Sequence, residues 1–181
     1  MLELNNHKSC IFGIQGSGKT VLAKHLLKGF RKPIVYRVNS DFDNENVYLY
    51  KPVDIFKELE SFTKWFISSE HDLLILDEAD MFFRSNAHIG INFNDLAINH
   101  RHYGKTLILI SRRPQDIPTK IVESCRYQFW FKVGDGSNVH RKIKEISQEL
   151  YDLMQQISFQ DYKFIIKPIG ETPYIHDKVV T

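Results

Sequence analysis

Residues 12–20, FGIQGSGKT, combine the side-chain types that are needed to hold a chain of phosphates. Gly13, Gly18, Lys19 and Thr20 fill the fixed positions of the pattern G-x-x-x-x-G-K-[ST]. Glycine permits a turn tight enough for backbone N–H groups to converge on a pyrophosphate. The Lys19 ammonium can pair with the β- and γ-phosphates, and the Thr20 hydroxyl can ligate Mg²⁺.

The segments on either side of this loop are those that a phosphate site requires. The apolar segment 9–12 is typical of a buried strand, and residues 21–28 have apolar side chains at helical spacing. A helix that starts at the loop would direct its positive N-terminal end at the phosphates. We therefore expect a nucleoside triphosphate site with ATP and Mg²⁺ as ligands, although no base-specific motif separates ATP from GTP. The expected nucleotide-binding residues are Gly13, Gln15, Gly16, Ser17, Gly18, Lys19 and Thr20.

A second chemical feature is the pair of acids Asp77 and Glu78, which follows the apolar run 73–76. A run that is apolar at every position is typical of a central strand buried on both faces. Open α/β sheets bind their ligands at the carboxyl ends of such strands. There we expect Asp77 to reach Mg²⁺, directly or through water, and Glu78 to polarise the water that attacks the γ-phosphate.

The acidic pair favours hydrolysis over phosphoryl transfer to a small acceptor, since a kinase must not activate water. Two alternatives stay open. A nucleoside kinase of the thymidine-kinase type also has a P-loop and a strand ending in Asp-Glu-Ala, but such enzymes usually hold zinc through four cysteines, and this chain has only Cys10 and Cys125. A phage assembly protein like those of filamentous phages usually has a transmembrane helix. We expect no transmembrane segment here, because no apolar run approaches about eighteen residues.

Composition indicates an ordinary globular protein with an uneven distribution of charge. The net charge is +2 over 181 residues, yet residues 101–144 contain ten basic and three acidic side chains. Such a basic half could face a polyanion such as nucleic acid. The two cysteines indicate reduced core residues in a cytosolic protein.

Hydrophobic periodicity predicts strands and helices that alternate along the chain. We expect strands at 9–12, 34–38, 73–76, 106–110, 126–133 and 162–166, and helices at 21–28, 53–69, 92–103, 137–146 and 149–157. This alternation predicts a three-layer α/β fold with a mostly parallel central sheet, formed by residues 1–181 as a single ATPase domain.

The order of these segments resembles the FtsK–HerA superfamily of ring-forming, DNA-pumping ATPases. The quoted segments are the P-loop, LLILDEAD, NHRHYGKTLILISRRPQDIP and YQFWFKV, and the resemblance covers residues 11–146. Within the superfamily, the small size is similar to that of the genome-packaging ATPases of tailless, internal-membrane double-stranded DNA viruses. The resemblance implies a P-loop NTPase fold of the RecA/ASCE-like type that hydrolyses ATP to move double-stranded DNA. It also implies a homo-oligomeric ring, a pentamer or hexamer, in the host cytoplasm or associated with the virion, with a capsid or membrane packaging vertex as a further partner.

The same resemblance assigns roles to several residues after the P-loop. Family members usually have Thr-Gln or Ser-Gln at the end of the strand where a glutamine senses the γ-phosphate, and here Ser111 and Arg112 take these places. Arg112 is then expected either to stabilise transition-state charge in its own site or to turn to the DNA. Rings of this kind complete each site with an arginine from the neighbouring subunit. Arg101 is our first choice for this role, with Arg84 and Arg113 as reserves.

Four other polar residues are given no role. His100 and His102 lack a partner at metal-ligand spacing, and Asp41 and Asp43, in SDFDNEN, are typical of a polar loop rather than a metal site. The predicted catalytic residues are Glu78, Lys19, Arg101 and Arg112, and the predicted metal ligands are Thr20 and Asp77.

Overall fold

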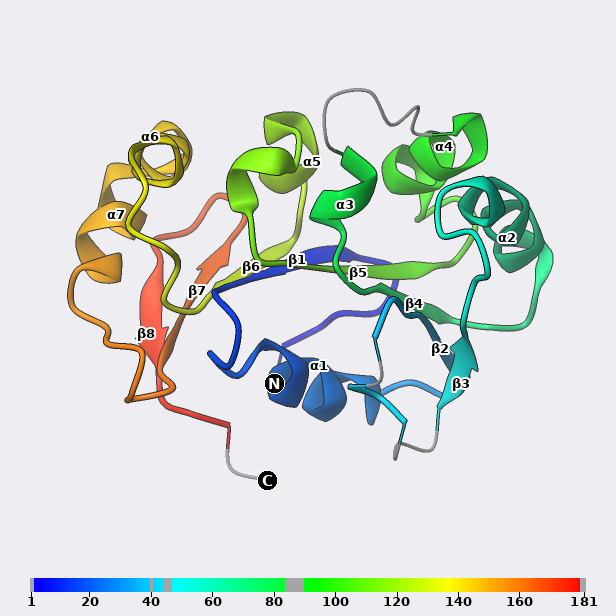
Figure 1. Ribbon diagram of the computed structural model, residues 1–181, viewed down its shortest axis with the longest axis horizontal. Coiled ribbons are helices and arrows are strands. Elements are labelled where there is room, and N and C mark those ends of the chain that lie inside the picture. The colour runs from blue at the N-terminus through cyan, green and yellow to red at the C-terminus, as the bar shows by residue number, and fades with distance from the viewer. Residues whose placement is uncertain (1, 40, 44–46, 84–89, 180–181) are drawn as a thin grey trace.

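An eight-stranded sheet lies at the centre of the computed structural model, which describes residues 2–39, 41–43, 47–83 and 90–179 (Figure 1). The strands are β1 (Lys8–Phe12), β2 (Pro33–Tyr36), β3 (Tyr48–Tyr50), β4 (Leu73–Leu76), β5 (Thr106–Ser111), β6 (Tyr127–Trp130), β7 (Phe164–Pro168) and β8 (Tyr174–His176). Their order across the sheet is β3-β2-β4-β5-β1-β6-β7-β8. Every pair from β3 to β6 is parallel, whereas the β6–β7 and β7–β8 pairs are antiparallel.

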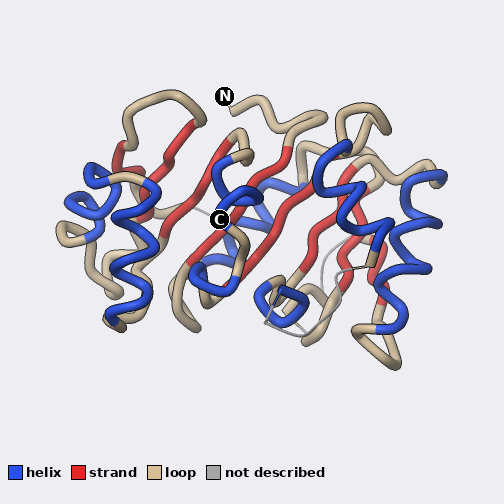
Figure 2. The backbone as a smooth tube through the Cα atoms, turned by 90° about the horizontal axis from the view of Figure 1, so that it is seen from above, coloured by secondary structure: helices blue, strands red, loops and turns tan. Residues whose placement is uncertain are grey.

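The helices divide unequally between the two faces of the sheet. Among the described residues, α1 (Lys19–Leu27) is the helix that covers one face, and the others lie on the opposite face (Figure 1). These are α2 (Lys57–Ser68), α3 (Asp80–Phe83), α4 (Ile91–Asn99), the 3-10 helix η1 (Pro114–Asp116), α5 (Thr119–Glu123), α6 (Ser137–Ile146) and α7 (Gln148–Met154). Figure 2 looks onto this second face and shows helices lying across the strands. The predicted α/β fold with a mostly parallel sheet is therefore confirmed.

The inner strands supply alternate side chains to two hydrophobic cores, one on each face of the sheet. In β1, Cys10 and Phe12 belong to the core beneath α2–α7, whereas Ile11 belongs to the core beneath α1. All residues of β1 and β4 are buried, as expected for strands covered on both sides. Each fully buried aliphatic or aromatic side chain is worth about 1.5–3 kcal/mol, so packing holds the strand ends, and with them the site, in place.

The shortest elements were not predicted from the sequence. β3 and β8 have three residues each and lie at the sheet edges with partly exposed side chains, so they show little alternation of apolar and polar residues. α4 ends at Asn99 instead of residue 103, because residues 100–104 form a turn in which Gly104 has a φ of 63°. No helix in the described part of the chain is long and apolar enough to cross a membrane. That residues 1–181 form a single ATPase domain stays a prediction.

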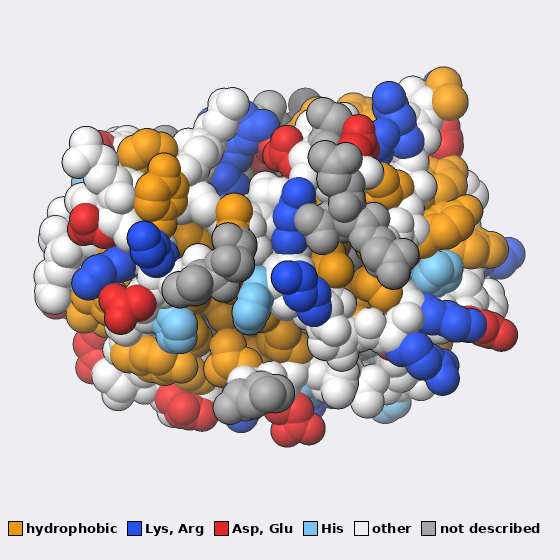
Figure 3. Space-filling view, turned by 90° about the horizontal axis from the view of Figure 1, so that it is seen from below, with side chains coloured by type: hydrophobic (Ala, Val, Ile, Leu, Met, Phe, Trp, Pro, Cys, Tyr) orange, Lys and Arg blue, Asp and Glu red, His pale blue; other side chains and the backbone are white. Residues whose placement is uncertain are grey.

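The face that carries α1 is hydrophobic where the chain ends meet the sheet. A cavity of about 930 Å³ lies there, with Leu22, Phe129 and Phe164 in its lining. Figure 3 shows hydrophobic side chains gathered on this face. Lys178 and Val179, which follow β8, border both this cavity and a second one at the carboxyl edge of the sheet.

Candidate nucleotide site

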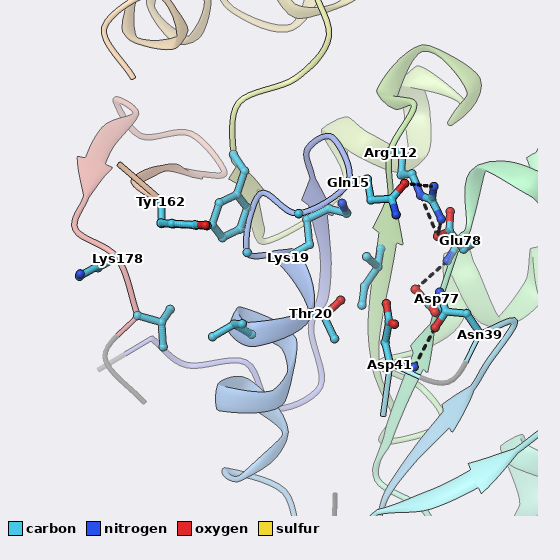
Figure 4. Close-up of a pocket in the computed structure, with 16 residues that line it drawn as sticks. Gln15, Lys19, Thr20, Asn39, Asp41, Asp77, Glu78, Arg112, Tyr162 and Lys178 are labelled. Atoms are coloured by element: carbon cyan, nitrogen blue, oxygen red, sulfur yellow. Dashed lines mark hydrogen bonds and ion pairs between the residues drawn. The ribbon is translucent and has the colours of Figure 1, made fainter. Parts of the chain in front are cut away.

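The P-loop connects β1 to α1 at the edge of the sheet where the parallel strands end. Phe12, at the end of β1, pairs with Ser111 at the end of β5, and β4 ends at this edge with Leu76. The residues that follow β4 and β5 begin with Asp77 and Arg112, so two segments far apart in the sequence meet beside the P-loop. Figure 4 shows this arrangement.

Two glycines of the P-loop are required by its packing. A Cβ at Gly13 would lie 2.5 Å from Ser17 Oγ and 2.7 Å from Phe131 Cβ, which is too close for any side chain. Gly18 is the N-cap of α1 and has a φ of 106°, a left-handed conformation that residues with side chains rarely adopt. The two glycine positions of the motif are therefore required by this backbone.

The polar side chains of the P-loop are only partly satisfied by the protein. Lys19 is 8% exposed, and its Nζ donates to the carbonyl oxygen of Ile14 at 2.8 Å. Burial lowers the pKa of Lys19, while the charge of Glu78 acts in the opposite direction. Ser17 Oγ is buried and has no hydrogen-bond partner among the described residues. Buried polar groups normally have hydrogen-bond partners. A phosphate group would be a suitable partner for both Lys19 and Ser17.

Asp77 has one satisfied carboxylate oxygen and one orphaned oxygen. Oδ1 accepts from the backbone N–H of Glu78 at 3.0 Å, whereas the buried Oδ2 has no hydrogen-bond partner within the described residues. Burial raises the pKa of Asp77 to about 7, and the negative charge of Glu78 adds to this shift. A divalent cation would offset the lost hydration of this carboxylate.

The residues present thus fit Mg²⁺. Thr20 lines the same cavity as Asp77 and offers a hydroxyl oxygen, the hard ligand that Mg²⁺ prefers. In the described part of the chain, no group of three or more His, Cys, Asp or Glu side chains is arranged to hold a metal. The ion would therefore depend on phosphate oxygens and water for its remaining ligands, as Mg²⁺ usually does in nucleotide sites.

Arg112 links Glu78 to the P-loop. Its Nε donates to Glu78 Oε1 at 2.8 Å, its Nη2 contacts the same oxygen, and its Nη1 donates to Gln15 Oε1 at 3.3 Å. Glu78 has a φ of 52°, a conformation that costs a residue with a side chain about 1–3 kcal/mol and persists where the surroundings impose it. The side chain of Arg112 lines the candidate site of its own chain (Figure 4), and both roles expected for it stay predictions.

The cavity at this edge has a volume of about 780 Å³ and extends to both sides of Lys19 and Thr20. We call one side the acidic end, lined by Asn39, Asp41, Asp77, Glu78 and Arg112. We call the other the aromatic end, where Tyr162 and Lys178 lie. Figure 4 shows Tyr162 and Lys178 on the side of the P-loop away from Glu78.

Several of these lining residues were missed by sequence reasoning. Asp41 was assigned to a polar loop without a role, but it lines the acidic end, and its charge helps to raise the pKa of Asp77. Its place after β2 was a usable signal, because β2 pairs with β4 and both end at this edge. No local signal marks Tyr162 or Lys178, because the pairing of β7 and β8 with the sheet brings them here.

Ser111 does not line the cavity, although it was predicted to contact the nucleotide. It is 1% exposed, its hydroxyl donates to Asp80 Oδ1 at 3.0 Å, and it accepts from the backbone N–H of Arg113 at 3.0 Å. These bonds hold the turn that follows β5, which carries Arg112. Contact between Ser111 and a nucleotide stays a prediction.

The arginines proposed to act in a neighbouring site lie elsewhere. Arg101 precedes the start of β5, at the opposite edge of the sheet from the P-loop, and its Nη2 is 3.2 Å from His7 Nδ1. Arg113 pairs with Asp116, with 2.9 Å between Nε and Oδ2. Arg84 lies outside the described residues. Arg101 therefore lies too far away to contact the P-loop of its own chain.

Several basic side chains of the segment 101–144 are buried or make contacts within the protein. Lys105 and Lys142 are buried, and the half-buried Lys132 donates to the carbonyl oxygen of Met154 at 3.4 Å. The basic side chains of this segment that are exposed are Arg101, Arg112, Arg113, Lys120, Arg141 and Lys144. The charge available to a polyanion is therefore smaller than the sequence count indicates.

Comparison with known protein families assigns the chain to one of them. The family described as "Zonular occludens toxin (Zot)" matches residues 9–164. The chain belongs to the Zot family. The match begins in β1, before the P-loop, and ends at the start of β7, so this Zot-family segment contains both nucleotide motifs. A comparison with curated protein sequences gave no significant match.

Solved structures with the same fold come from a virus and from bacteria. The genome packaging NTPase B204 from Sulfolobus turreted icosahedral virus 2, in complex with sulfate, matches with a TM-score of 0.80 at 22% identity, over 99% of this chain and 99% of that chain. EssC (ATPases 2 and 3) from Geobacillus thermodenitrificans matches with a TM-score of 0.70 at 15% identity, over 99% of this chain and 40% of that chain. The N-terminal domain of zonular occludens toxin from Neisseria meningitidis matches with a TM-score of 0.57 at 12% identity, over 98% and 95% of the two chains. Identities this low show a shared fold, and at that level the predicted resemblance to genome-packaging ATPases is confirmed.

Proposed function

We propose that this Zot-family chain hydrolyses ATP at the carboxyl edge of its sheet and uses the hydrolysis to move double-stranded DNA. The observation that carries the proposal is the meeting of the P-loop with Asp77 and Glu78 in one cavity, where one buried Asp77 oxygen has no hydrogen-bond partner among the residues that the structure describes. The B204 structure in complex with ATP-gammaS, at 20% identity, supports ATP as the ligand. The comparisons do not favour the nucleoside kinase or the phage assembly protein.

The P-loop residues 13–20 would bind the triphosphate through backbone N–H groups at the N-terminus of α1. Lys19 would exchange the Ile14 carbonyl, which it contacts at 2.8 Å, for phosphate oxygens. Thr20 and Asp77 would hold Mg²⁺, which when bound supplies positive charge to the phosphate oxygens. Since Asp77 has a pKa of about 7 here, it must lose its proton before it can act as a ligand.

Glu78 would accept the proton of the attacking water, which requires that its carboxylate be accessible. In the structure Arg112 holds this carboxylate. A γ-phosphate competes for the guanidinium, because arginine binds phosphate through paired, charge-assisted hydrogen bonds. Loading of ATP would therefore draw Arg112 toward the phosphate, where it can stabilise transition-state charge, and release Glu78 for catalysis.

The site would be completed by a second copy of the chain. Arg101 is exposed and lies at the sheet edge opposite the P-loop, so it can serve only a neighbour's nucleotide. We propose a homo-oligomeric ring, a pentamer or hexamer, that grips the DNA backbone electrostatically. By analogy with the described function of B204, this ring would package a viral genome in the host cytoplasm, with a capsid or membrane vertex as its docking partner.

The test is the ATPase rate of the purified protein with and without duplex DNA, together with its oligomeric state. We expect Mg²⁺-dependent hydrolysis that duplex DNA stimulates, and a stimulation that declines steeply as salt rises. Hydrolysis by a strict monomer that no nucleic acid affects would contradict the motor while leaving the ATPase intact. Absence of hydrolysis in every assembly state would contradict both.

A further inference from the structure

The chain has two cysteines, and the fold brings them together. Cys10 lies in β1, directly upstream of the P-loop, whereas Cys125 lies between α5 and β6. They are 115 positions apart, yet their Sγ atoms are 3.1 Å apart and both residues are fully buried. Bonded sulfurs lie about 2.05 Å apart, so a bond would need an approach of only about 1 Å.

Chance and packing are weak explanations of this contact. A buried residue touches about 6–12 others, so two cysteines placed independently in a core of this size would touch in about one case in eight. The pair is also too small for a metal site, and the described residues contain no cluster of three or more metal-ligating side chains. The Cys125 thiol has a separate acceptor in the carbonyl oxygen of Ile121, at 3.2 Å. The core therefore does not need the sulfur–sulfur contact for hydrogen bonding.

We propose that Cys10 and Cys125 form an intrachain disulfide when the protein meets a disulfide oxidant. A thiolate of one cysteine attacks the oxidant's S–S bond and displaces one thiolate, which takes up a proton. The second cysteine, as its thiolate, then attacks the mixed disulfide, so the Cys10–Cys125 bond forms and the oxidant leaves as two thiols. The sequence alone predicts two reduced core thiols, because each cysteine lies on or next to a predicted strand.

The position of the pair determines how fast this exchange runs. Burial raises the pKa of the Cys10 thiol, which disfavours the reactive thiolate in the closed core. Cys125 follows Ser124, the C-cap of the five-residue helix α5, and both Glu123 and Ser124 are exposed. Exchange is therefore expected through local opening of α5 or during folding, and it is slow in the closed protein.

The bond would fasten the strand that carries the P-loop to the segment between α5 and β6. It would close a loop of about 115 residues, and constraint of the unfolded chain grows with loop length. We expect the oxidised protein to melt roughly 5–15 °C above the reduced protein.

The test is to refold the purified chain in the presence of oxidised or reduced glutathione, so that slow exchange in the closed core does not limit the reaction. The protein is then denatured and alkylated with iodoacetamide, and its intact mass is measured. After oxidation we expect no alkylation, a mass about 2 Da below that of the unmodified dithiol, and one cross-linked peptide pair containing Cys10 and Cys125. The reduced sample should carry two alkyl groups. Cys10→Ala and Cys125→Ala are the matched controls, and in each the melting temperature should no longer depend on the redox state.

Three results would overturn the proposal: two alkylated thiols after oxidation, glutathione retained on both cysteines, or disulfide-linked dimers in place of the internal bond. An unchanged melting temperature with the bond formed would overturn its stabilising role. None of these outcomes depends on ATP hydrolysis, so the inference stands or fails separately from the proposed function.

Discussion

At the acidic end of the nucleotide cavity, the side chains follow strands that are adjacent in the sheet, whereas at the aromatic end Tyr162 and Lys178 come from the last segments of the chain. The acidic end is tied together by hydrogen bonds, such as those from Arg112 to Glu78 and Gln15. At the aromatic end, the contact recorded for Tyr162 is a ring contact with Phe159, with centroids 6.4 Å apart. Hydrolysis requires polar groups that are fixed in position before the reaction. Stacking of a nucleotide base on an aromatic ring needs less exact geometry. We infer that the acidic end sets kcat and the aromatic end sets affinity.

The substitution with the largest expected effect on kcat tests whether the acidic end also needs a residue from a neighbouring chain. Arg101→Ala should lower kcat by about 10³–10⁵-fold with little change in ATP binding, because a finger supplied by a neighbour acts on the transition state. Mixing this variant with Glu78→Gln subunits should restore some steady-state ATPase activity. Arg141→Ala, which removes an exposed arginine of α6, is the control and should leave kcat unchanged. Without rescue, Arg101 has no support as a residue that acts across subunits.

A second substitution probes the metal at the acidic end. Asp77→Asn should weaken the apparent Mg²⁺ affinity by roughly 10–100-fold or more, since it removes the charge of a ligand. The measurement is a Mg²⁺ titration of ATPase activity, with Asp135→Asn in an exposed loop as the control. An unchanged Mg²⁺ dependence would remove Asp77 from its proposed role.

A third substitution addresses the aromatic end. Tyr162→Ala should raise KM for ATP by roughly 10-fold and leave kcat unchanged, because loss of one stacking ring weakens ground and transition states alike. Inhibition by inorganic tripolyphosphate, which has no base, should not change. Tyr174→Ala is the matched control, because this tyrosine of β8 is similarly exposed but does not line the cavity. A fall in kcat for Tyr162→Ala would break the division between the two ends.

The smallest expected effect concerns stability without nucleotide. Folding raises the pKa of Asp77 from its ordinary 3.8 to about 7, so the folded state favours the protonated acid. The stability contributed by this proton is present at low pH and is lost as pH rises from about 4 to about 7. In metal-free buffer, the melting temperature of the native protein should therefore fall by a few degrees relative to Asp77→Asn over this window. Parallel pH profiles for the two proteins would show that Asp77 titrates normally.

Features that depend on residues close together in the chain could be predicted from the sequence, whereas features that depend on contacts between distant segments could not. The P-loop and the strand before Asp77 have local signatures, since glycine spacing and an apolar run are set by the backbone and by burial. The short edge strands β3 and β8 have no such signature. The positions of Tyr162 and Lys178 depend on the pairing of β7 and β8 with the sheet, and the contact between Cys10 and Cys125 depends on the pairing of β6 with β1. Neither could be derived from spacing along the chain. Arg112 was placed beside the nucleotide or the DNA, and only the structure shows that it binds Glu78.

The central claim is that the P-loop and the acidic pair form one hydrolytic site, and Glu78→Gln tests it most directly because the change removes a base and preserves shape. Steady-state hydrolysis and binding of ATP should be measured on the same preparation. We predict that ATP binds with near-normal affinity while kcat falls by about 10²–10⁴-fold. Turnover at a near-normal rate would contradict the account.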